Sequence, residues 1–139
     1  MVILYDRFNL PGDIFELIFA TDQQKIVGKE LIKYMLHQGG EITKTEMSMF
    51  ATELHDNQYE TVLEDGPFKG KKVKMSYNKR QFYDRILTPM KSMGLIDYDL
   101  YKKTYRVSTK FYNDMMRIGL MWKKELSRRG FKDTSTSEA

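Results

Sequence analysis

Residues 78–106 read NKRQFYDRILTPMKSMGLIDYDLYKKTYR, and the predicted fold is organised around this stretch. Its first half predicts a helix, because apolar side chains recur at steps of three and four and therefore share one face: Tyr83, Ile86, Leu87, Met90 and Met93. Gly94 predicts the end of that helix, since glycine readily takes the left-handed conformation found just past a helix. Leu95 then supplies the apolar contact that closes such an end.

Beyond Gly94 the apolar period changes from 3.6 to about 2, which is typical of strands. Leu95, Ile96 and Tyr98 precede a tip at residues 100–103, and Tyr105 and Val107 follow it. The sequence therefore predicts a basic hairpin over 95–107, directly behind the helix.

The face of the predicted helix opposite its apolar stripe is polar. Side chains of these types hydrogen-bond to guanine and adenine edges in the major groove of DNA. The alternative is a surface helix without a binding function, because the outer face of an amphipathic helix is normally charged and solvated. The basic hairpin that follows favours DNA contact, and the predicted base-contacting residues are Asn78, Lys79, Arg80, Gln81, Asp84, Arg85 and Thr88.

The charge of the chain is unevenly distributed. Residues 1–68 hold five Lys or Arg against twelve Asp or Glu, a net charge of −7. Residues 69–110 hold twelve against three, a net charge of +9, and residues 111–139 carry +2. A basic block inside a chain of net charge +4 is typical of a phosphate-binding face.

The N-terminal part predicts an extended arm and three helices. The arm covers 1–12 and ends at Pro11-Gly12, and a short buried helix follows Asp13. Thr21 and Gln24 fit a capping box for a helix that ends before Gly39-Gly40. A short strand is expected over 41–43, and a third helix over 44–54.

Residues 55–77 are predicted to form an inserted hairpin or loop, because strand-like flanks enclose a turn-rich tip at 65–70. Its returning strand is basic. Two interpretations of these lysines stay open: they contact phosphates, or they protect an edge strand from pairing with another chain. The lysines are Lys69, Lys71, Lys72 and Lys74.

A long C-terminal helix is expected over 108–129, capped by Ser108, with a flexible tail over 131–139. One apolar stripe is expected to pack against the domain's own core: Phe111, Met115, Ile118, Trp122 and Leu126. Further apolar residues widen it and predict the interface of a homodimer with two DNA-reading helices about 34–36 Å apart. These are Met116, Leu120 and Met121.

Motifs for catalysis or cofactors are missing from the sequence. It has no cysteine, and His37 and His55 lack a ligand partner at helical spacing. No glycine-rich phosphate loop and no nucleophile motif occurs. We therefore expect no enzyme activity, no metal and no cofactor. Without a signal peptide or an apolar span, we expect no membrane contact and a cytoplasmic location, nucleoid-associated if the protein binds DNA.

The chain resembles the winged helix-turn-helix superfamily, in the style of MarR-like and PadR-like regulators. The resemblance rests on Tyr83, Leu87, Met90, residues 93–96 and residues 105–107. The resemblance covers roughly residues 21–129, within a single domain expected over 1–130. It implies a mainly α, α+β winged-helix fold, a recognition helix in the major groove and a symmetric dimer. It also implies wing contacts with DNA from Tyr101, Lys102, Lys103 and Arg106.

Two departures from the family pattern stand out. The insertion at 55–77 replaces a short turn, and Pro89 lies inside the predicted recognition helix, where it should kink the axis. The leading hypothesis is a homodimeric transcriptional regulator that binds specific sites on double-stranded DNA. The alternative is a winged-helix module that binds proteins in a transcription or replication complex. The sequence does not identify a small-molecule effector.

Overall fold

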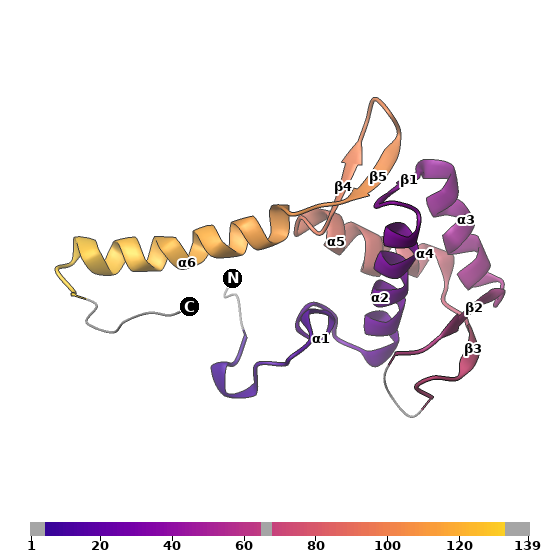
Figure 1. Ribbon diagram of the computed structural model, residues 1–139, viewed down its shortest axis with the longest axis horizontal. Helices are drawn as coiled ribbons and strands as arrows, with labels where there is room; N and C mark the ends of the chain where they lie inside the picture. Colours follow the sequence, from indigo (N-terminus) through magenta and orange to yellow (C-terminus); the bar gives the residue numbers. More distant parts are fainter. Residues whose placement is uncertain (1–4, 65–67, 133–139) are drawn as a thin grey trace.

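The computed structural model describes residues 5–64 and 68–132. Helices combine with two small antiparallel sheets, so the predicted α+β class is confirmed. Figure 1 shows a body of packed helices from which a hairpin and the C-terminal helix project. The elements are η1 (Arg7–Asn9), α1 (Ile14–Ile18), α2 (Asp22–His37), β1 (Glu41–Thr43), α3 (Lys44–His55), β2 (Tyr59–Val62), β3 (Lys72–Met75), α4 (Lys79–Gln81), η2 (Phe82–Leu87), α5 (Thr88–Ser92), β4 (Ile96–Asp99), β5 (Thr104–Val107) and α6 (Lys110–Arg128).

The larger sheet joins two distant parts of the chain. Its strand order is β1-β5-β4, and both strand pairs are antiparallel. Ile42 of β1 lies opposite Tyr105 of β5, and both are buried together with Ile96 of β4. One face of the sheet therefore belongs to the core. The strand over 41–43 and the hairpin over 95–107 are confirmed at these positions.

Side-chain caps determine where α2 and α3 begin. The Thr21 hydroxyl accepts a hydrogen bond from the Gln24 backbone N–H at 3.1 Å. At α3 the exchange is reciprocal: Thr43 accepts from the Glu46 N–H at 3.0 Å, and the Glu46 carboxylate accepts from the Thr43 N–H at 2.8 Å. Two N–H groups that a helix start leaves unpaired are thereby satisfied.

The core lies between α2, α3, the sheet and a helical stretch over 79–92, called the central helix below. Phe50 of α3 packs at its centre, with ring centroids 5.6 Å from Phe82 and 5.2 Å from Tyr34. The side chains that are fully buried include Val27, Leu31, Met35, Met47, Leu54, Phe82, Ile86 and Met90.

The central helix consists of α4, the π-helical turn η2, and α5. In η2 the N–H of Thr88 bonds to the carbonyl of Tyr83, five residues back. Pro89 accounts for this wide turn, because in a regular α-helix its ring clashes with the carbonyl of residue 85. The kink predicted at Pro89 therefore takes the form of a π turn.

The same turn changes which side chains point into the core. Phe82 is completely buried, and the sequence analysis had left it out of the apolar face. Tyr83 is partly buried and packs against the core as predicted, whereas Met93 is 38% exposed, so the prediction that Met93 belongs to the buried face is wrong. A wide turn shifts the phase of the helix, which a constant spacing of three and four does not anticipate.

The predicted insertion contains a hairpin, β2–β3, in which Glu60 lies opposite Lys74 and Val62 opposite Lys72. Lys33 of α2 holds it by donating from Nζ to the Thr61 hydroxyl at 3.0 Å and to the Val62 carbonyl at 3.2 Å. Residues 65–67 of the predicted tip at 65–70 lie outside the described residues.

α6 begins at Lys110, two residues after the predicted Ser108, and no residue in it is buried. Figure 1 shows it extending away from the body. The expectation that its apolar stripe packs on the domain's own core is therefore wrong. The backbone explains the departure: the N–H of Phe111 bonds to the Gly94 carbonyl at 3.0 Å, which starts the helix at the corner between α5 and β4.

The N-terminal arm is not fully extended, because Asp6 caps the short turn η1. In α1, Ile14 is 38% exposed and Leu17 42% exposed, so the prediction of a buried helix is wrong there. Phe19, just past α1, is the side chain of this segment that is buried. Residues 1–4 of the predicted arm and 133–139 of the predicted tail lie outside the described residues.

Candidate nucleic-acid interface

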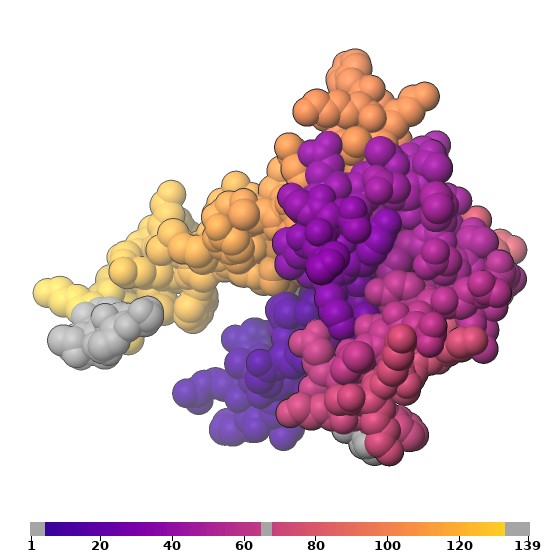
Figure 2. All heavy atoms as spheres, turned by 45° about the vertical axis from the view of Figure 1, so that its right-hand side comes forward, coloured from indigo at the N-terminus to yellow at the C-terminus, as the bar shows by residue number. Residues whose placement is uncertain are grey.

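The basic block over 69–110 is distributed over three parts of the fold. These are the β2–β3 hairpin, the central helix and the β4–β5 hairpin. Figures 1 and 2, which share their vertical axis, show the two hairpins at opposite ends of the body. The structure therefore groups the central helix with the β4–β5 hairpin that follows it, and separates the β2–β3 lysines from that hairpin.

The free face of the central helix carries Arg80, Gln81, Asp84, Arg85 and Thr88, all exposed. The Arg80 guanidinium approaches Asp84 at 3.8 Å, and the two side chains are 91% and 66% exposed. An ion pair so open to solvent contributes little to stability. Arg80 and Arg85 are therefore available to a ligand.

Two residues predicted to contact bases are engaged within the protein. Asn78 caps the central helix by accepting a hydrogen bond from the Gln81 N–H at 3.0 Å. Lys79 donates from Nζ to the Thr52 hydroxyl at 2.8 Å and to the Ser48 hydroxyl at 3.3 Å. Lys79 fastens the start of the central helix to α3, and Asn78 caps it, so both help to position the arginines that follow.

His55 takes part in the same junction. Its Nδ1 accepts a hydrogen bond from the Lys79 backbone N–H at 3.1 Å. His55 is exposed, and this hydrogen bond helps to join the end of α3 to the start of the central helix.

The β4–β5 turn is held by a local carboxylate. Asp99 Oδ1 accepts from the backbone N–H groups of Lys102 at 3.1 Å and Tyr101 at 2.9 Å, and these bonds lower the pKa of Asp99. Lys103 has a positive φ of 54°, which completes the turn. Lys102 and Lys103 are exposed, and Tyr101 is 99% exposed. A tight turn thus presents these side chains outward.

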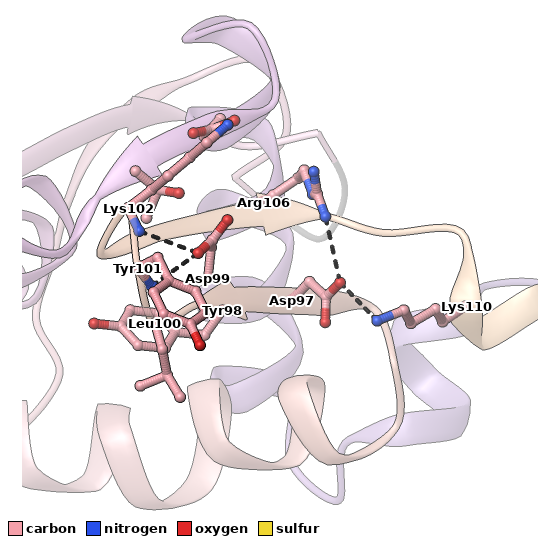
Figure 3. Close-up of a pocket in the computed structure, with 10 residues that line it drawn as sticks. Asp97, Tyr98, Asp99, Leu100, Tyr101, Lys102, Arg106 and Lys110 are labelled. Atoms are coloured by element: carbon pink, nitrogen blue, oxygen red, sulfur yellow. Dashed lines mark hydrogen bonds and ion pairs between the residues drawn. The ribbon is translucent and has the colours of Figure 1, made fainter.

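The outer face of this hairpin is less basic than the sequence suggested. Asp97 Oδ2 lies 2.8 Å from Lys110 Nζ and 3.6 Å from Arg106 Nη2, as Figure 3 shows. The hydrogen bond from Lys110 is the main cause that holds the pKa of Asp97 below its usual value. Glu41 lies opposite Arg106 on the neighbouring strand. Arg106, a predicted wing contact, is thus partly neutralised beside a hollow of about 320 Å³.

Lys91 is a candidate contact that the sequence analysis missed. Its ammonium lies 5.8 Å from the ring centroid of Tyr105 and 5.9 Å from that of Tyr98. This exposed lysine connects the end of the central helix with the Tyr98–Tyr105 pair of the β4–β5 hairpin. Lys91 lies three residues after Thr88, and this helical spacing places it on the same exposed face as Thr88.

The four lysines of the first hairpin are all exposed, but they belong to another side of the molecule. β2 is fastened to α2 by Lys33, and the Tyr59 hydroxyl donates to the buried Glu30 carboxylate at 3.4 Å. Burial, followed by the nearby Glu30 charge, raises the pKa of Tyr59 far above its usual value. The hairpin therefore stays docked on α2. Its lysines are Lys69, Lys71, Lys72 and Lys74.

Within residues 5–64 and 68–132, no group of three or more His, Asp or Glu side chains is placed to hold a metal ion. In the same two ranges, no helix combines the length and apolar character needed to cross a membrane. Comparisons with protein-family models, with curated proteins and with solved structures found no match.

Proposed function

We propose that the chain is a winged helix-turn-helix protein that binds specific sequences of double-stranded DNA. In this proposal it is a transcriptional regulator that acts as a homodimer. The central helix is the recognition helix, and the β4–β5 hairpin is the wing. The observation that carries the proposal is the free arginine face of the central helix, continued by Lys91 toward the wing.

The order of elements supports this assignment. α2, β1, α3, the central helix and the wing follow one another, and β1 pairs with the second strand of the wing. Lys79 and His55 fasten the start of the central helix to α3, the helix before it. Such support is needed because base contacts require side chains on a rigid element.

The chemistry of the exposed side chains supports duplex DNA as the ligand. Arg80 and Arg85 can each pair with the O6 and N7 atoms of a guanine. Lys102 and Lys103 at the turn of the wing supply phosphate contacts, which set affinity without reading sequence. The β2–β3 lysines have no role in this proposal, because they lie at the other end of the body.

The wing turn also supports a second candidate function, a module that binds proteins. Leu100 is 75% exposed and Tyr101 99% exposed, and neither is needed for phosphate contact. Tyrosine is one of the residue types enriched among the side chains that dominate binding at protein interfaces. The Asp97 and Glu41 carboxylates beside Arg106 also favour a module that binds proteins.

Selection of bound sequences from random duplex DNA separates the two functions. We expect enrichment of an inverted repeat. Binding that enriches no sequence, or no binding at low salt, would favour the protein-interaction module.

Two alanine variants, each of which removes one arginine, then test the recognition helix itself. Arg85→Ala should weaken binding to the selected site by about 1–3 kcal/mol and relax the preference at one base. Arg128→Ala is the matched control, because it removes the same charge from α6. Equal losses on selected and random DNA would mean that Arg85 contacts only phosphate.

A further inference from the structure

The C-terminal helix α6 presents an uncovered apolar stripe. The stripe consists of Phe111, Met115, Ile118, Trp122 and Leu126, at spacings of four, three, four and four. Met115 and Ile118 are each 47% exposed and Trp122 is 65% exposed. Figures 1 and 2 show most of the helix standing clear of the body. A helix that packs on nothing is marginal in water, so the stripe requires a partner surface.

The residues predicted to form the dimer interface do not extend this stripe. At 3.6 residues per turn, Met116, Leu120 and Met121 point about 100°, 140° and 120° away from Met115. All three are exposed; Met116 and Leu120 share one side of the helix, and Met121 points to another. The stripe itself, predicted to pack on the domain's own core, is exposed at Met115, Ile118 and Trp122 and partly covered at its two ends, Phe111 and Leu126.

The stripe is symmetric about its own midpoint, which falls between Ile118 and Gly119. Phe111 and Leu126 lie equally far from this point, and so do Met115 and Trp122. Two antiparallel copies that cross there place Phe111 opposite Leu126 and Met115 opposite Trp122. They also place Ile118 opposite Gly119, so a large side chain meets the smallest residue at the centre.

Gly119 has no function in the structure of a single chain. A Cβ built there would have no atom within 4 Å apart from its own helix backbone and chain neighbours. Glycine inside a helix is destabilising relative to alanine, so its presence here is costly without a close neighbour. A hollow of about 210 Å³ lies beside it, lined by Trp122, Leu126 and Phe131. The Ile118 side chain of a second copy would face this hollow.

The charges at the edge of the stripe permit self-association. Asp114 is paired with Arg117 of the same helix at 2.7 Å. Glu125 is paired with Arg129 at 2.8 Å and with Arg128 at 3.3 Å. Two copies therefore approach without bringing unpaired carboxylates together.

We infer that α6 binds a second copy of this chain in antiparallel orientation, through the stripe from Phe111 to Leu126 centred on Gly119. The inference rests on the homodimer of the proposed function and specifies its face and direction. It does not depend on DNA binding, because the pairing is measured without DNA.

The absence of cysteine from the sequence makes disulfide cross-linking a direct test. In an antiparallel pair Met115→Cys should cross-link to Trp122→Cys when the two variants are mixed, and neither should cross-link to itself. The two copies of residue 115 would lie about 10 Å apart along the axis, beyond the reach of a disulfide. Gly119→Cys should cross-link to itself, because it lies next to the two-fold axis.

Other results would overturn the inference. Self-cross-linking of Met115→Cys and of Trp122→Cys would show a parallel pair. A wild type that sediments as a monomer at micromolar concentration would show that the stripe has another occupant. DNA binding is tested separately, by selection of bound sequences from random duplex DNA.

Two glutamate variants compare the faces of α6 directly. Ile118→Glu places a charge in the stripe and should raise the dimer dissociation constant about tenfold or more. Leu120→Glu is the matched control, since it introduces the same charge on the opposite side and should leave dimerisation unchanged. Circular dichroism verifies that both variants are folded. Equal effects, or a larger effect of Leu120→Glu, would contradict the assignment of the stripe.

Discussion

At the scale of single residues, two helical glycines have opposite surroundings. Gly119 faces open space, whereas a Cβ at Gly28 of α2 would lie 2.5 Å from Cε2 of Phe19. Phe19 is buried against α2, so its ring has little room to move. Gly28 thus allows the segment after α1 to approach α2 closely.

Gly28→Ala should therefore lower the free energy of unfolding by about 1–3 kcal/mol, although alanine is the better helix former. Urea denaturation measures the change. The control is a double-mutant cycle with Phe19→Leu, which removes the ring atoms that meet the new methyl group. If the two substitutions act additively, the close approach is not the cause.

Lys79 illustrates how a basic residue on a predicted DNA-binding face can have a structural function. Its ammonium is held by the hydroxyls of Ser48 and Thr52 on α3. We expect Lys79→Met to reduce the free energy of unfolding by about 1–2 kcal/mol, since two partly buried hydrogen bonds are lost. Arg80→Met is the control, because its side chain is 91% exposed and should alter stability by less than about 0.5 kcal/mol. Equal stabilities of the two variants would contradict the structural role of Lys79.

At the scale of elements, local signals in the sequence predicted most of the fold. Caps, glycines and alternating apolar residues located α2, α3, the strand over 41–43 and both hairpins. The π turn around Pro89 and the direction of α6 were not predicted, because both depend on the packing and geometry of the folded chain. For the same reason the sequence did not reveal the docking of the β2–β3 hairpin on α2.

For the candidate site, the sequence predicted which side chains are exposed but not all of their partners. The exposed positions of Arg80 and Arg85 followed from helical spacing. The partners of Lys79 and Arg106 did not, because Thr52 and Asp97 lie on other elements. Residue type alone cannot show whether a cation is free or already paired.

Asp97 provides the prediction for the wing. Asp97→Asn removes a negative charge that holds both Arg106 and Lys110. Both cations become available to phosphate, so DNA affinity should rise for all sequences, and the slope of log K against log salt should steepen by up to about two units for each chain, at about 0.9 per phosphate contact. Filter binding between 50 and 200 mM salt is the measurement. The control is Asp114→Asn on α6, which also removes a paired carboxylate.

The same variant should change acid stability. Because the folded-state pKa of Asp97 is lowered, its contribution is present above the ordinary value of 3.8 and is lost as pH falls below it. Asp97→Asn should reduce the loss of folding stability below this pH. It should not alter stability near neutral pH by more than about 1 kcal/mol. If neither the salt dependence of DNA binding nor the stability at acid pH changes, the ion pairs of Asp97 with Arg106 and Lys110 do not persist in solution.

At the scale of the whole molecule, α6 determines how far apart the two recognition helices of the proposed homodimer lie. Each body is attached at the N-terminal end of its α6. In an antiparallel pair centred on Gly119, the two copies of residue 110 lie about 25 Å apart, from 1.5 Å of rise per residue. Figure 1 shows α5 beside the start of α6 and α4 farther from it, so the recognition helices extend outward beyond these points. In the proposed dimer their centres therefore lie beyond the two ends of this span of about 25 Å, and we expect a separation greater than one DNA turn of about 34–36 Å.

The last prediction follows from this geometry. Half-sites on the same side of the duplex are spaced by whole turns, so the selected inverted repeat should have centres about two turns, or 20–21 bp, apart. Binding to duplexes in which the spacing between half-sites varies from 8 to 24 bp measures this directly. Gly119→Cys protein, oxidised to the covalent dimer, should keep the same optimum, because the cross-link preserves the antiparallel pair. An optimum near 10 bp would require the two bodies to lie side by side, as a parallel α6 pair would place them.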